Sequence, residues 1–463
     1  MIGALLLAAS AGIVEEVKTL PGFGSTHVYH PASLDTARGV VLFVSGDGGW
    51  NLGVVDMARR IAPHAIVAGI SMPAWQKRVE SAASSCWYPA AELETAAQAL
   101  EKIYALPAYA PPILVGYSSG ATVVYGALAQ APPTTFGGAI SLGFCPDLEV
   151  ARHFCGRRGW TPTYDAKKRQ SWLPAAHDLK PRWVVLQGTI DQVCSSRQTI
   201  EFVHEVPGAE IVSLEHVGHG FSVPARWGAA FDRAVDGMLG AASLVEHAPA
   251  LTTALGDLGL PLEVLWPEQP RAVMIFVSGD GGWAELDASV ARGLFQRGIA
   301  VVGWNALRYF WSAKPPETLA RDLDRVLASL PRDMPVFAGG YSFGAEVIPV
   351  VALRSKERLA GLVLVAPGRF ATFEVSPLDW VRTNTASTDH PVRPAIGGIA
   401  PEPVLCLAPS EDGESGCPPA GPVGYERGEL PGGHHFDGAY DDLAARIAAF
   451  IDHVRTERGA ATE

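Results

Sequence analysis

Short apolar runs alternate with helix-length amphipathic stretches along the whole chain. The runs are rich in valine and isoleucine, apolar at both alternating positions, and bounded by glycine or proline. Such runs are typical of parallel strands that helices cover on both faces. In the first half they are GVVLFVSG, HAIVAGIS, PPILVGYS, GGAISLGF, RWVVLQG and AEIVSLEH. In the second half they are AVMIFVSG, GIAVVGW, PVFAGGYS, AGLVLVAP, EPVLCLAP and the region before His434.

Amphipathic stretches at residues 92–103 and 317–330 predict helices between these strands. The pattern therefore predicts an α/β fold in which each half is a mainly parallel, doubly wound sheet. Sheets of this kind place their ligands and chemistry at the carboxyl ends of the strands.

The two halves are copies of each other. FVSGDGGW occurs at residues 43–50 and again at 276–283, and four further pairs of similar blocks follow in the same order. Five matching blocks indicate two homologous domains. We expect an N-terminal domain at 21–245, a linker around 240–259, and a C-terminal domain at 246–463.

Composition narrows the function. The chain has 463 residues and a net charge of −12 at pH 7. A protein that binds nucleic acid normally needs a basic face, so we expect no nucleic-acid partner. Beyond the first dozen positions, no apolar stretch reaches the roughly 18 residues of a membrane-spanning helix.

The first 20 residues resemble a secretory signal segment. MIGALLLAASAG is a short apolar run that ends in small residues, although the basic start of a typical signal is missing. An ordinary N-terminal strand or helix is the alternative.

Six cysteines divide as four in the first half and two in the second. Even numbers favour disulfides within each domain and an oxidising compartment, with buried free thiols as the alternative. No CxxC pair is present, so the cysteine spacings do not resemble a zinc site. We expect no metal and no cofactor.

Each half contains G-x-S-x-G between a predicted strand and a predicted helix, centred on Ser118 and on Ser342. A serine on such a sharp turn exposes its hydroxyl as a nucleophile, as in α/β-hydrolases. We therefore expect two tandem α/β-hydrolase-like domains.

A serine nucleophile needs a base and a group that orients the base, and in α/β-hydrolases the acid follows the serine and the histidine comes last. The second half then gives Ser342, Asp412 and His434, with Glu411 and Glu414 as alternative acids. The register of the repeat selects His434 rather than His435.

The first half gives a second candidate triad of Ser118, Asp191 and His219 in the same order. It is either a second active site or a remnant of the duplication.

The repeated SGDGG sequence allows two interpretations. A phosphate-binding loop would need G-x-x-x-x-G-K-S/T or G-x-G-x-x-G, and neither is present. The position favours an oxyanion hole, with backbone N–H donors from Phe343, Asp280 and Gly281.

Substrate residues are expected where the halves differ. Glu346 follows the second nucleophile by four residues, where the first half has Thr122. Its carboxylate either binds a substrate ammonium or makes a buried structural hydrogen bond. We also expect Tyr341 and Trp283 to contact substrate. The aromatic run at 308–311 fits either a pocket wall or the core.

Together, SGDGGW, the RYFW segment, GYSFGAE and GGHHFDG resemble the bacterial AcvB/VirJ family, with the VirJ domain at the C-terminus. The resemblance implies a periplasmic serine esterase that cleaves the aminoacyl ester of aminoacyl-phosphatidylglycerol, typically the lysyl form. It also implies activity at Ser342, a lipid head group as partner at the membrane surface, and links to virulence and type IV secretion.

Two other functions remain open from the residues alone. One is a periplasmic adaptor for secretion-system or envelope proteins that uses the hydrolase fold as a scaffold. The other is a general carboxylesterase that acts on small esters.

Overall fold

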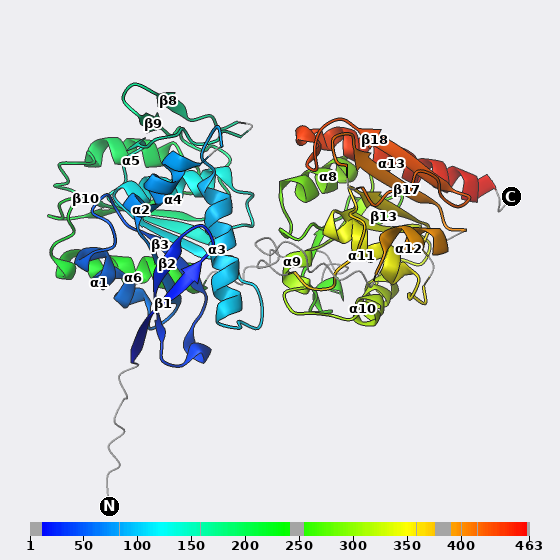
Figure 1. Ribbon diagram of the computed structural model, residues 1–463, viewed down its shortest axis with the longest axis horizontal. Coiled ribbons are helices and arrows are strands. Elements are labelled where there is room, and N and C mark those ends of the chain that lie inside the picture. Colours follow the sequence, from blue (N-terminus) through cyan, green and yellow to red (C-terminus); the bar gives the residue numbers. More distant parts are fainter. Residues whose placement is uncertain are drawn as a thin grey trace, which may run out of the picture. The chain divides into compact units, whose positions relative to one another are not determined.

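The computed structural model describes residues 12–82, 84–157, 159–240, 254–357, 359–375, 390–399, 401–413 and 415–460. The chain forms two compact units (Figure 1). The first comprises Met1–Leu106 and Ala110–Val245, and the second comprises Pro107–Tyr109 and Glu246–Glu463. The boundary expected near residue 245 lies outside the described residues.

The N-terminal unit is built on an eight-stranded sheet of order β1-β2-β4-β3-β5-β6-β10-β11. β1 pairs antiparallel with β2, and β2 pairs antiparallel with β4. Every other pair is parallel. The strands are β1 (Ile13–Leu20), β2 (Gly24–Pro31), β3 (Val40–Val44), β4 (Ile66–Ile70), β5 (Ile113–Tyr117), β6 (Gly138–Leu142), β10 (Trp183–Gly188) and β11 (Glu210–Leu214).

The C-terminal unit repeats this order without the first strand, as β12-β14-β13-β15-β16-β17-β18. Only β12 is antiparallel to its neighbour. The strands are β12 (Leu262–Leu265), β13 (Val273–Val277), β14 (Ala300–Trp304), β15 (Val336–Tyr341), β16 (Gly361–Val365), β17 (Val404–Pro409) and β18 (Tyr425–Leu430). The predicted fold class, two α/β-hydrolase-like domains with mainly parallel sheets, is confirmed.

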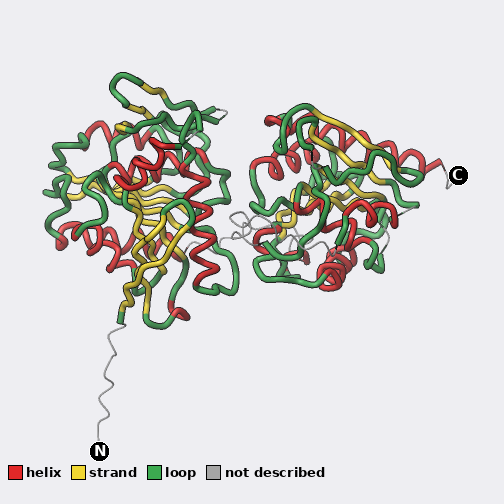
Figure 2. Tube along the Cα trace, viewed as in Figure 1, coloured by secondary structure: helices red, strands yellow, loops and turns green. Residues whose placement is uncertain are grey.

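Helices follow the strands in both units, as Figure 2 shows by colour. The N-terminal unit has α1 (Leu52–Ile61), α2 (Met72–Ser81), α3 (Pro89–Ile103), α4 (Ser119–Gln130), α5 (Ser196–His204), α6 (Pro224–Gly240) and a 3₁₀ turn, η1 (Leu34–Thr36). The C-terminal unit has α8 (Glu285–Gln296), α9 (Ala306–Tyr309), α10 (Pro316–Ala328), α11 (Phe343–Ala352), α12 (Val392–Gly398), α13 (Tyr440–Ala460) and η2 (Phe436–Gly438). None of the helices in the described ranges has the length and apolar character that crossing a bilayer requires.

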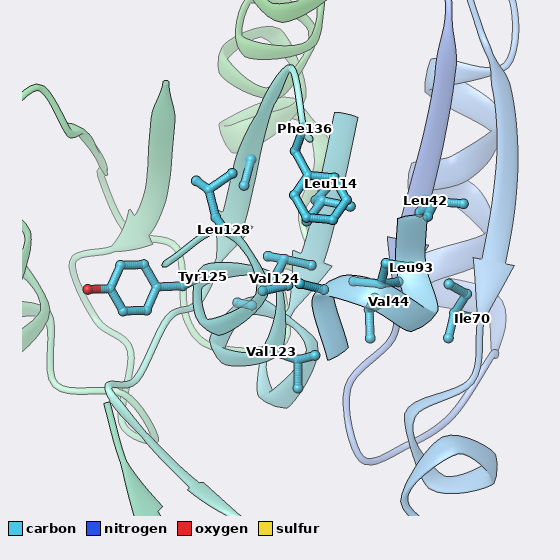
Figure 3. Packing of buried hydrophobic residues seen from close by; sticks show 14 of the residues in the cluster. Leu42, Val44, Ile70, Leu93, Leu114, Val123, Val124, Tyr125, Leu128 and Phe136 are labelled. Atoms are coloured by element: carbon cyan, nitrogen blue, oxygen red, sulfur yellow. The ribbon is translucent and has the colours of Figure 1, made fainter. Parts of the chain in front are cut away.

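Each sheet has an apolar core on both faces. Leu42 and Val44 of β3 lie in one cluster with residues of α3 and α4, part of which Figure 3 shows. Val41 and Phe43, which alternate with them, lie in a second cluster with residues of α1 and α6. Because successive strand side chains point to opposite faces, a strand covered on both sides must be apolar throughout. This is the pattern that the sequence carries.

The predicted parallel strands are all present, but the antiparallel strands were not predicted. β1, β2 and β12 are short or polar on one side, and an edge strand of this kind lacks the continuous apolar run of a buried one. The sequence also did not indicate a small antiparallel sheet of order β7-β9-β8, formed by β7 (Asp147–Glu149), β8 (Thr163–Asp165) and β9 (Gln170–Trp172).

The sequence predicted a possible signal segment at residues 1–20 and a domain that starts at residue 21. The predicted domain start is wrong. Ile13–Leu20 forms β1, which pairs along its whole length with β2. These residues belong to the fold of the N-terminal unit because their backbone groups complete the sheet. Residues 1–11, which carry the apolar run, lie outside the described residues.

All six cysteines form disulfides within their own unit. The pairs are Cys86–Cys155, Cys145–Cys194 and Cys406–Cys417. The second pair joins the loop after β6 to the loop after β10, and both loops lie at the carboxyl ends of their strands.

Candidate active site

Both candidate nucleophiles lie on a strained turn between a strand and a helix. Ser118 has φ 55° and ψ −123°, and Ser342 has φ 50° and ψ −116°. L-residues rarely adopt positive φ, and strain of this kind is concentrated at functional sites. The turn lifts the hydroxyl clear of the sheet at the N-terminus of the following helix.

The glycines of G-x-S-x-G are required for close packing of this turn. A Cβ atom at Gly344 would lie 2.1 Å from the carbonyl oxygen of Val277, and one at Gly120 would lie 2.3 Å from that of Val44. The helix that follows each serine therefore packs directly on the neighbouring strand, β13 or β3.

In the C-terminal domain the structure brings Ser342, His434 and Asp412 together. Ser342 Oγ lies 2.8 Å from His434 Nε2, and His434 Nδ1 lies 2.9 Å from Asp412 Oδ2. In the tautomer with a proton on Nδ1, His434 donates to Asp412 and accepts from the serine hydroxyl. Glu411 is exposed beside Asp412, and Glu414 lies outside the described residues.

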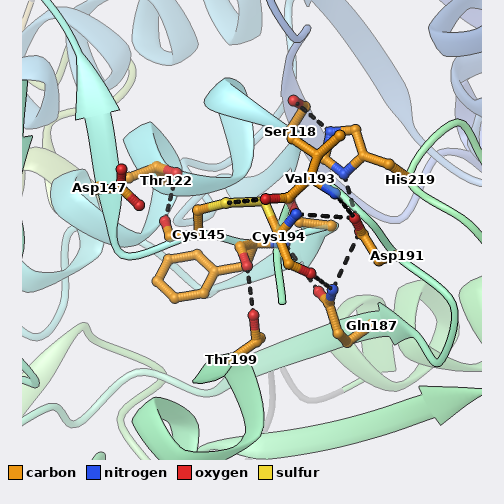
Figure 4. The surroundings of a disulfide bond; sticks show 12 residues. Ser118, Thr122, Cys145, Asp147, Gln187, Asp191, Val193, Cys194, Thr199 and His219 are labelled. Carbon is orange, nitrogen blue, oxygen red and sulfur yellow. Dashed lines mark hydrogen bonds and ion pairs between the residues drawn. A yellow bond between two sulfur atoms is a disulfide. The ribbon is translucent and has the colours of Figure 1, made fainter. Parts of the chain in front are cut away.

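The N-terminal domain contains the same arrangement (Figure 4). His219 Nε2 lies 2.9 Å from Ser118 Oγ, and His219 Nδ1 lies 2.9 Å from Asp191 Oδ2. In both domains the acid follows the last strand but one of the sheet, β10 or β17, and the histidine follows the last strand, β11 or β18. Each arrangement has the order and contacts that let a serine hydroxyl act as a nucleophile. The catalytic role of these residues stays a prediction.

The SGDGG loop lies beside the nucleophile in each domain. A Cβ atom at Gly46 would lie 3.0 Å from Ser118 Cβ, and one at Gly279 would lie 3.9 Å from Ser342 Cβ. This closeness is compatible with N–H donors at Asp280 and Gly281. Phe343 is the first residue of α11, and the first N–H groups of a helix have no acceptor within it. The oxyanion-hole assignment of these three residues stays a prediction.

A serine at the start of this loop anchors it, which sequence reasoning missed. The hydroxyl of Ser45 accepts a hydrogen bond from Met72 N at 3.0 Å, and that of Ser278 accepts one from Ala306 N at 2.9 Å. The contact joins the loop to the segment after the neighbouring strand, β4 or β14. The identity of the loop in both copies was the signal that could have revealed this role.

The substrate contact expected for Tyr341 stays a prediction, and the structure gives this residue a structural role. Its side chain is buried, and its hydroxyl donates to the carbonyl oxygen of His434 at 3.1 Å and lies 3.0 Å from His435 Nδ1. Tyr117 donates to the carbonyl oxygen of His219 at 2.9 Å in the same way. These tyrosines hold the turn that carries the histidine.

The substrate contact expected for Trp283 also stays a prediction, and the structure places this residue in the core. Its indole ring is buried over β14, where a Cβ atom at Gly303 would lie 2.2 Å from the ring. Its ring also lies near that of Phe276, at 6.5 Å between ring centroids. The tryptophan that ends FVSGDGGW therefore fills space above a strand glycine. Trp50 occupies the same place over Gly69 in the N-terminal domain.

The aromatic run at 308–311 belongs to the core. Tyr309, Phe310 and Trp311 are buried, and the ring of Phe310 packs against that of Phe343 with centroids 5.0 Å apart. Arg308 alone is exposed.

Glu346 lies one helical turn from Ser342, with Oε1 accepting a hydrogen bond from Gly368 N at 3.0 Å. Burial raises the pKa of Glu346 to about 7, against the Gly368 hydrogen bond and together with the negative charge of Asp280. The two carboxylates are thus close enough to repel each other. A substrate cation placed between them would relieve that repulsion.

Asp287 is a second acidic group near this site that sequence reasoning did not find. It is buried, and its Oδ2 accepts a hydrogen bond from Ala284 N at 3.1 Å, at the start of α8. Burial raises the pKa of Asp287 to about 7 in spite of backbone hydrogen bonds, and Asp280 adds to the effect. The equivalent residue of the first domain is Val54, so no pattern in the repeat pointed to it.

One family model and several solved structures are similar to parts of this chain. The family model described as bacterial virulence protein (VirJ) matches residues 271–455. No curated protein matches the sequence. Among solved structures, a CIB-like hydrolase from Thermoplasma acidophilum is 14% identical with a TM-score of 0.33, covering 50% of this chain and 100% of its own. The esterase domain of a Rhodothermus marinus protein is 12% identical with a TM-score of 0.34, also covering 50% and 100%.

Proposed function

Because residues 271–455 form a VirJ-family domain with a hydrogen-bonded serine, histidine and aspartate, we propose that this protein is a serine esterase acting through Ser342. Its substrate is aminoacyl-phosphatidylglycerol, in the lysyl form, and its products are the free amino acid and phosphatidylglycerol. The observation that carries the proposal is the continuous contact from Asp412 through His434 to Ser342.

The geometry supports a two-step acyl transfer. His434 takes the proton of the Ser342 hydroxyl as the oxygen attacks the ester carbonyl carbon. N–H groups at Phe343 and in the SGDGG loop stabilise the oxyanion. Phosphatidylglycerol leaves with the proton from His434, and a water molecule, activated by His434, then hydrolyses the aminoacyl-serine. Asp412 keeps the imidazole in the required tautomer throughout.

The acidic groups around Ser342 support a cationic acyl group. Glu346 and Asp280 lie near the nucleophile, and the exposed Glu411 adjoins Asp412. A lysyl group carries an ammonium on its side chain, which a buried carboxylate binds more strongly than an exposed one does. Glu346 is the group that we assign to this ammonium.

We also place the protein in the periplasm, in contact with lipid head groups at the membrane surface. Three disulfides suit an oxidising compartment and are uncommon in the reducing cytosol.

The test is hydrolysis of vesicles that contain lysyl-phosphatidylglycerol by the full chain, followed as released lysine. We expect release by the wild type and by Ser118→Ala, and only background release by Ser342→Ala with an unchanged melting temperature. A folded wild type that releases no lysine, yet hydrolyses small esters, would replace the lipid assignment by a general carboxylesterase.

Replacing Glu346 by glutamine is expected to reduce selectivity for the cationic acyl group. The measurement is the ratio of kcat/KM for lysine ethyl ester to that for norleucine ethyl ester, whose side chain lacks the ammonium. Loss of one charge-assisted contact should lower this ratio about tenfold or more.

The same ratio should depend on pH in the wild type. Below its pKa of about 7 Glu346 is neutral, so the ratio should rise as the pH increases from 6 to 8. Both esters carry the same α-amino group, whose titration cancels in the ratio. In Glu346→Gln the ratio should be low and flat across this range. A wild-type ratio that the substitution leaves unchanged would show that Glu346 has only its structural bond to Gly368.

A further inference from the structure

The N-terminal domain contains a complete Ser118–His219–Asp191 arrangement that lies outside the VirJ match. Its contacts are as short as those of the C-terminal domain, and its nucleophile has the same strained turn. A duplicated site that had lost its function would have no need to keep this strain, which costs about 1–3 kcal/mol.

The acid of this site is more enclosed than its counterpart. The Asp191 side chain is 0% exposed, whereas that of Asp412 is 23% exposed. Asp191 accepts hydrogen bonds from the backbone N–H groups of Val193 and Cys194, both at 2.9 Å, and from Gln187 Nε2 at 3.2 Å. Burial acts to raise the pKa of Asp191, but His219 and these backbone donors outweigh it and lower the pKa. The carboxylate is therefore held ionised.

The Cys145–Cys194 disulfide further restrains the loop that carries Asp191. It ties the loop that carries Asp191 to the end of β6, as Figure 4 shows. Cys194 is also one of the residues whose N–H group binds Asp191. The C-terminal disulfide, Cys406–Cys417, begins within β17.

The surroundings of Ser118 lack the carboxylate found one helical turn from Ser342. Thr122 stands at the position of Glu346, and its hydroxyl donates to the carbonyl oxygen of Cys145 at 2.7 Å. Asp147, drawn in the same view, accepts a hydrogen bond from Gln170 at 2.7 Å. Asp47 of the SGDGG loop corresponds to Asp280 in the second domain, so an aspartate at this position does not distinguish the two sites.

The loop that carries the acid of the triad also has fewer acidic residues in the N-terminal domain than in the C-terminal domain. Ile190 and Val193, on either side of Asp191, are exposed, with 67% of the Val193 side chain's surface accessible. Counted from the acid, the corresponding residues of the second domain are Glu411 and Glu414. At these two positions the N-terminal domain has apolar residues and the C-terminal domain has acidic ones. Val223, four residues after His219, is exposed as well.

We propose that the N-terminal domain is a second, independent esterase site that hydrolyses esters of an uncharged, apolar acyl group. Ser118 Oγ attacks the ester carbonyl carbon while His219 takes its proton, and the alcohol leaves with that proton. Water then cleaves the acyl-serine to give the free acid and regenerate Ser118. The reaction consumes one ester and one water and needs no other reactant.

The test uses the full chain with p-nitrophenyl butyrate as the uncharged ester and lysine ethyl ester as the cationic one. Three variants are compared: Ser118→Ala, Ser342→Ala and the double variant. Ser213→Ala, at an exposed serine on β11, is the matched control within the same domain. An activated serine attacks the phosphorus of a fluorophosphonate probe and fluoride leaves, so the probe becomes bonded to the serine. The labelled residue shows directly which serine is activated.

We expect Ser118→Ala to reduce butyrate turnover at least 100-fold and to leave lysine ester turnover within twofold. Ser342→Ala should do the reverse, and mass spectrometry of this variant should find the probe on Ser118. Absence of label on Ser118 in a folded protein, with butyrate turnover that depends only on Ser342, would overturn the proposal. Equal turnover of both esters at Ser118 would overturn its preference for an uncharged group. These outcomes do not depend on whether the C-terminal site acts on lipid.

Discussion

His434→Gln is expected to reduce hydrolysis of lysine ethyl ester about 10⁵-fold or more, because removing the base of a serine triad costs nearly as much as removing the whole triad. His435→Gln is the matched control, since this histidine is adjacent in sequence. Its Nδ1 lies 3.0 Å from the Tyr341 hydroxyl, and no contact with Ser342 is recorded for it. We expect it to change the rate less than tenfold.

Both variants should be measured as kcat/KM in a Ser118→Ala background, so that the N-terminal site makes no contribution. The His434 side chain is 42% exposed, so the melting temperature of His434→Gln should stay close to that of the parent. Burial and the neighbouring His434 lower the pKa of His435, which keeps it neutral. If His435→Gln lost the larger share of activity, the register that aligns His434 with His219 would be wrong.

The parallel core of each domain could be predicted from the sequence because burial on both faces leaves a continuous apolar run. β3, β5 and β15 carry such runs, and each appears where the pattern places it. The edge strands could not be predicted in this way. β1 alternates exposed residues such as Glu15 and Val17 with partly covered charged ones such as Glu16, so its pairing with β2 depends on backbone bonds that no apolar pattern reports.

The chemistry of the site was predictable where function constrains the order of residues. Ser342, Asp412 and His434 lie at the ends of three different strands, and topology alone brings such ends to one edge of the sheet. The structural roles of Tyr341 and Trp283 were not predictable, because the occurrence of a residue in a repeated motif does not show what its side chain contacts. Whether an aromatic side chain faces substrate, a histidine turn or a strand glycine depends on packing in three dimensions.

The acidic groups near the nucleophile could be predicted only in part. The difference between Glu346 and Thr122 is visible in the repeat, but the closeness of Asp280 and the burial of Asp287 are not. A raised pKa needs both desolvation and a neighbouring charge, and only the folded chain supplies them. The repeat therefore identified the position at which the two sites differ. The structure showed in which direction the pKa of the acidic group there is shifted.

The loop of acidic residues after β17 leads to the second large expected effect. Asp412→Asn should reduce lysine ester hydrolysis about 10⁴-fold, because the asparagine amide N–H can donate to His434 Nδ1 and so stabilises the tautomer with its proton on Nε2, which cannot accept the proton of the serine hydroxyl. Glu411→Gln removes the same charge one residue away and is the matched control. Its side chain is exposed and no contact with His434 is recorded for it, so we expect less than a tenfold change.

The pH profile separates the orienting role of Asp412 from simple loss of charge. If Asp412 acts by fixing the tautomer, Asp412→Asn should lower kcat at every pH, while Glu411→Gln should affect only KM for the cationic ester. Similar losses in the two variants would mean that the loop acts through its total negative charge. The acid would then be interchangeable among the residues of this loop. The same comparison at Asp191 has no such ambiguity, because Ile190 and Val193 beside it are apolar.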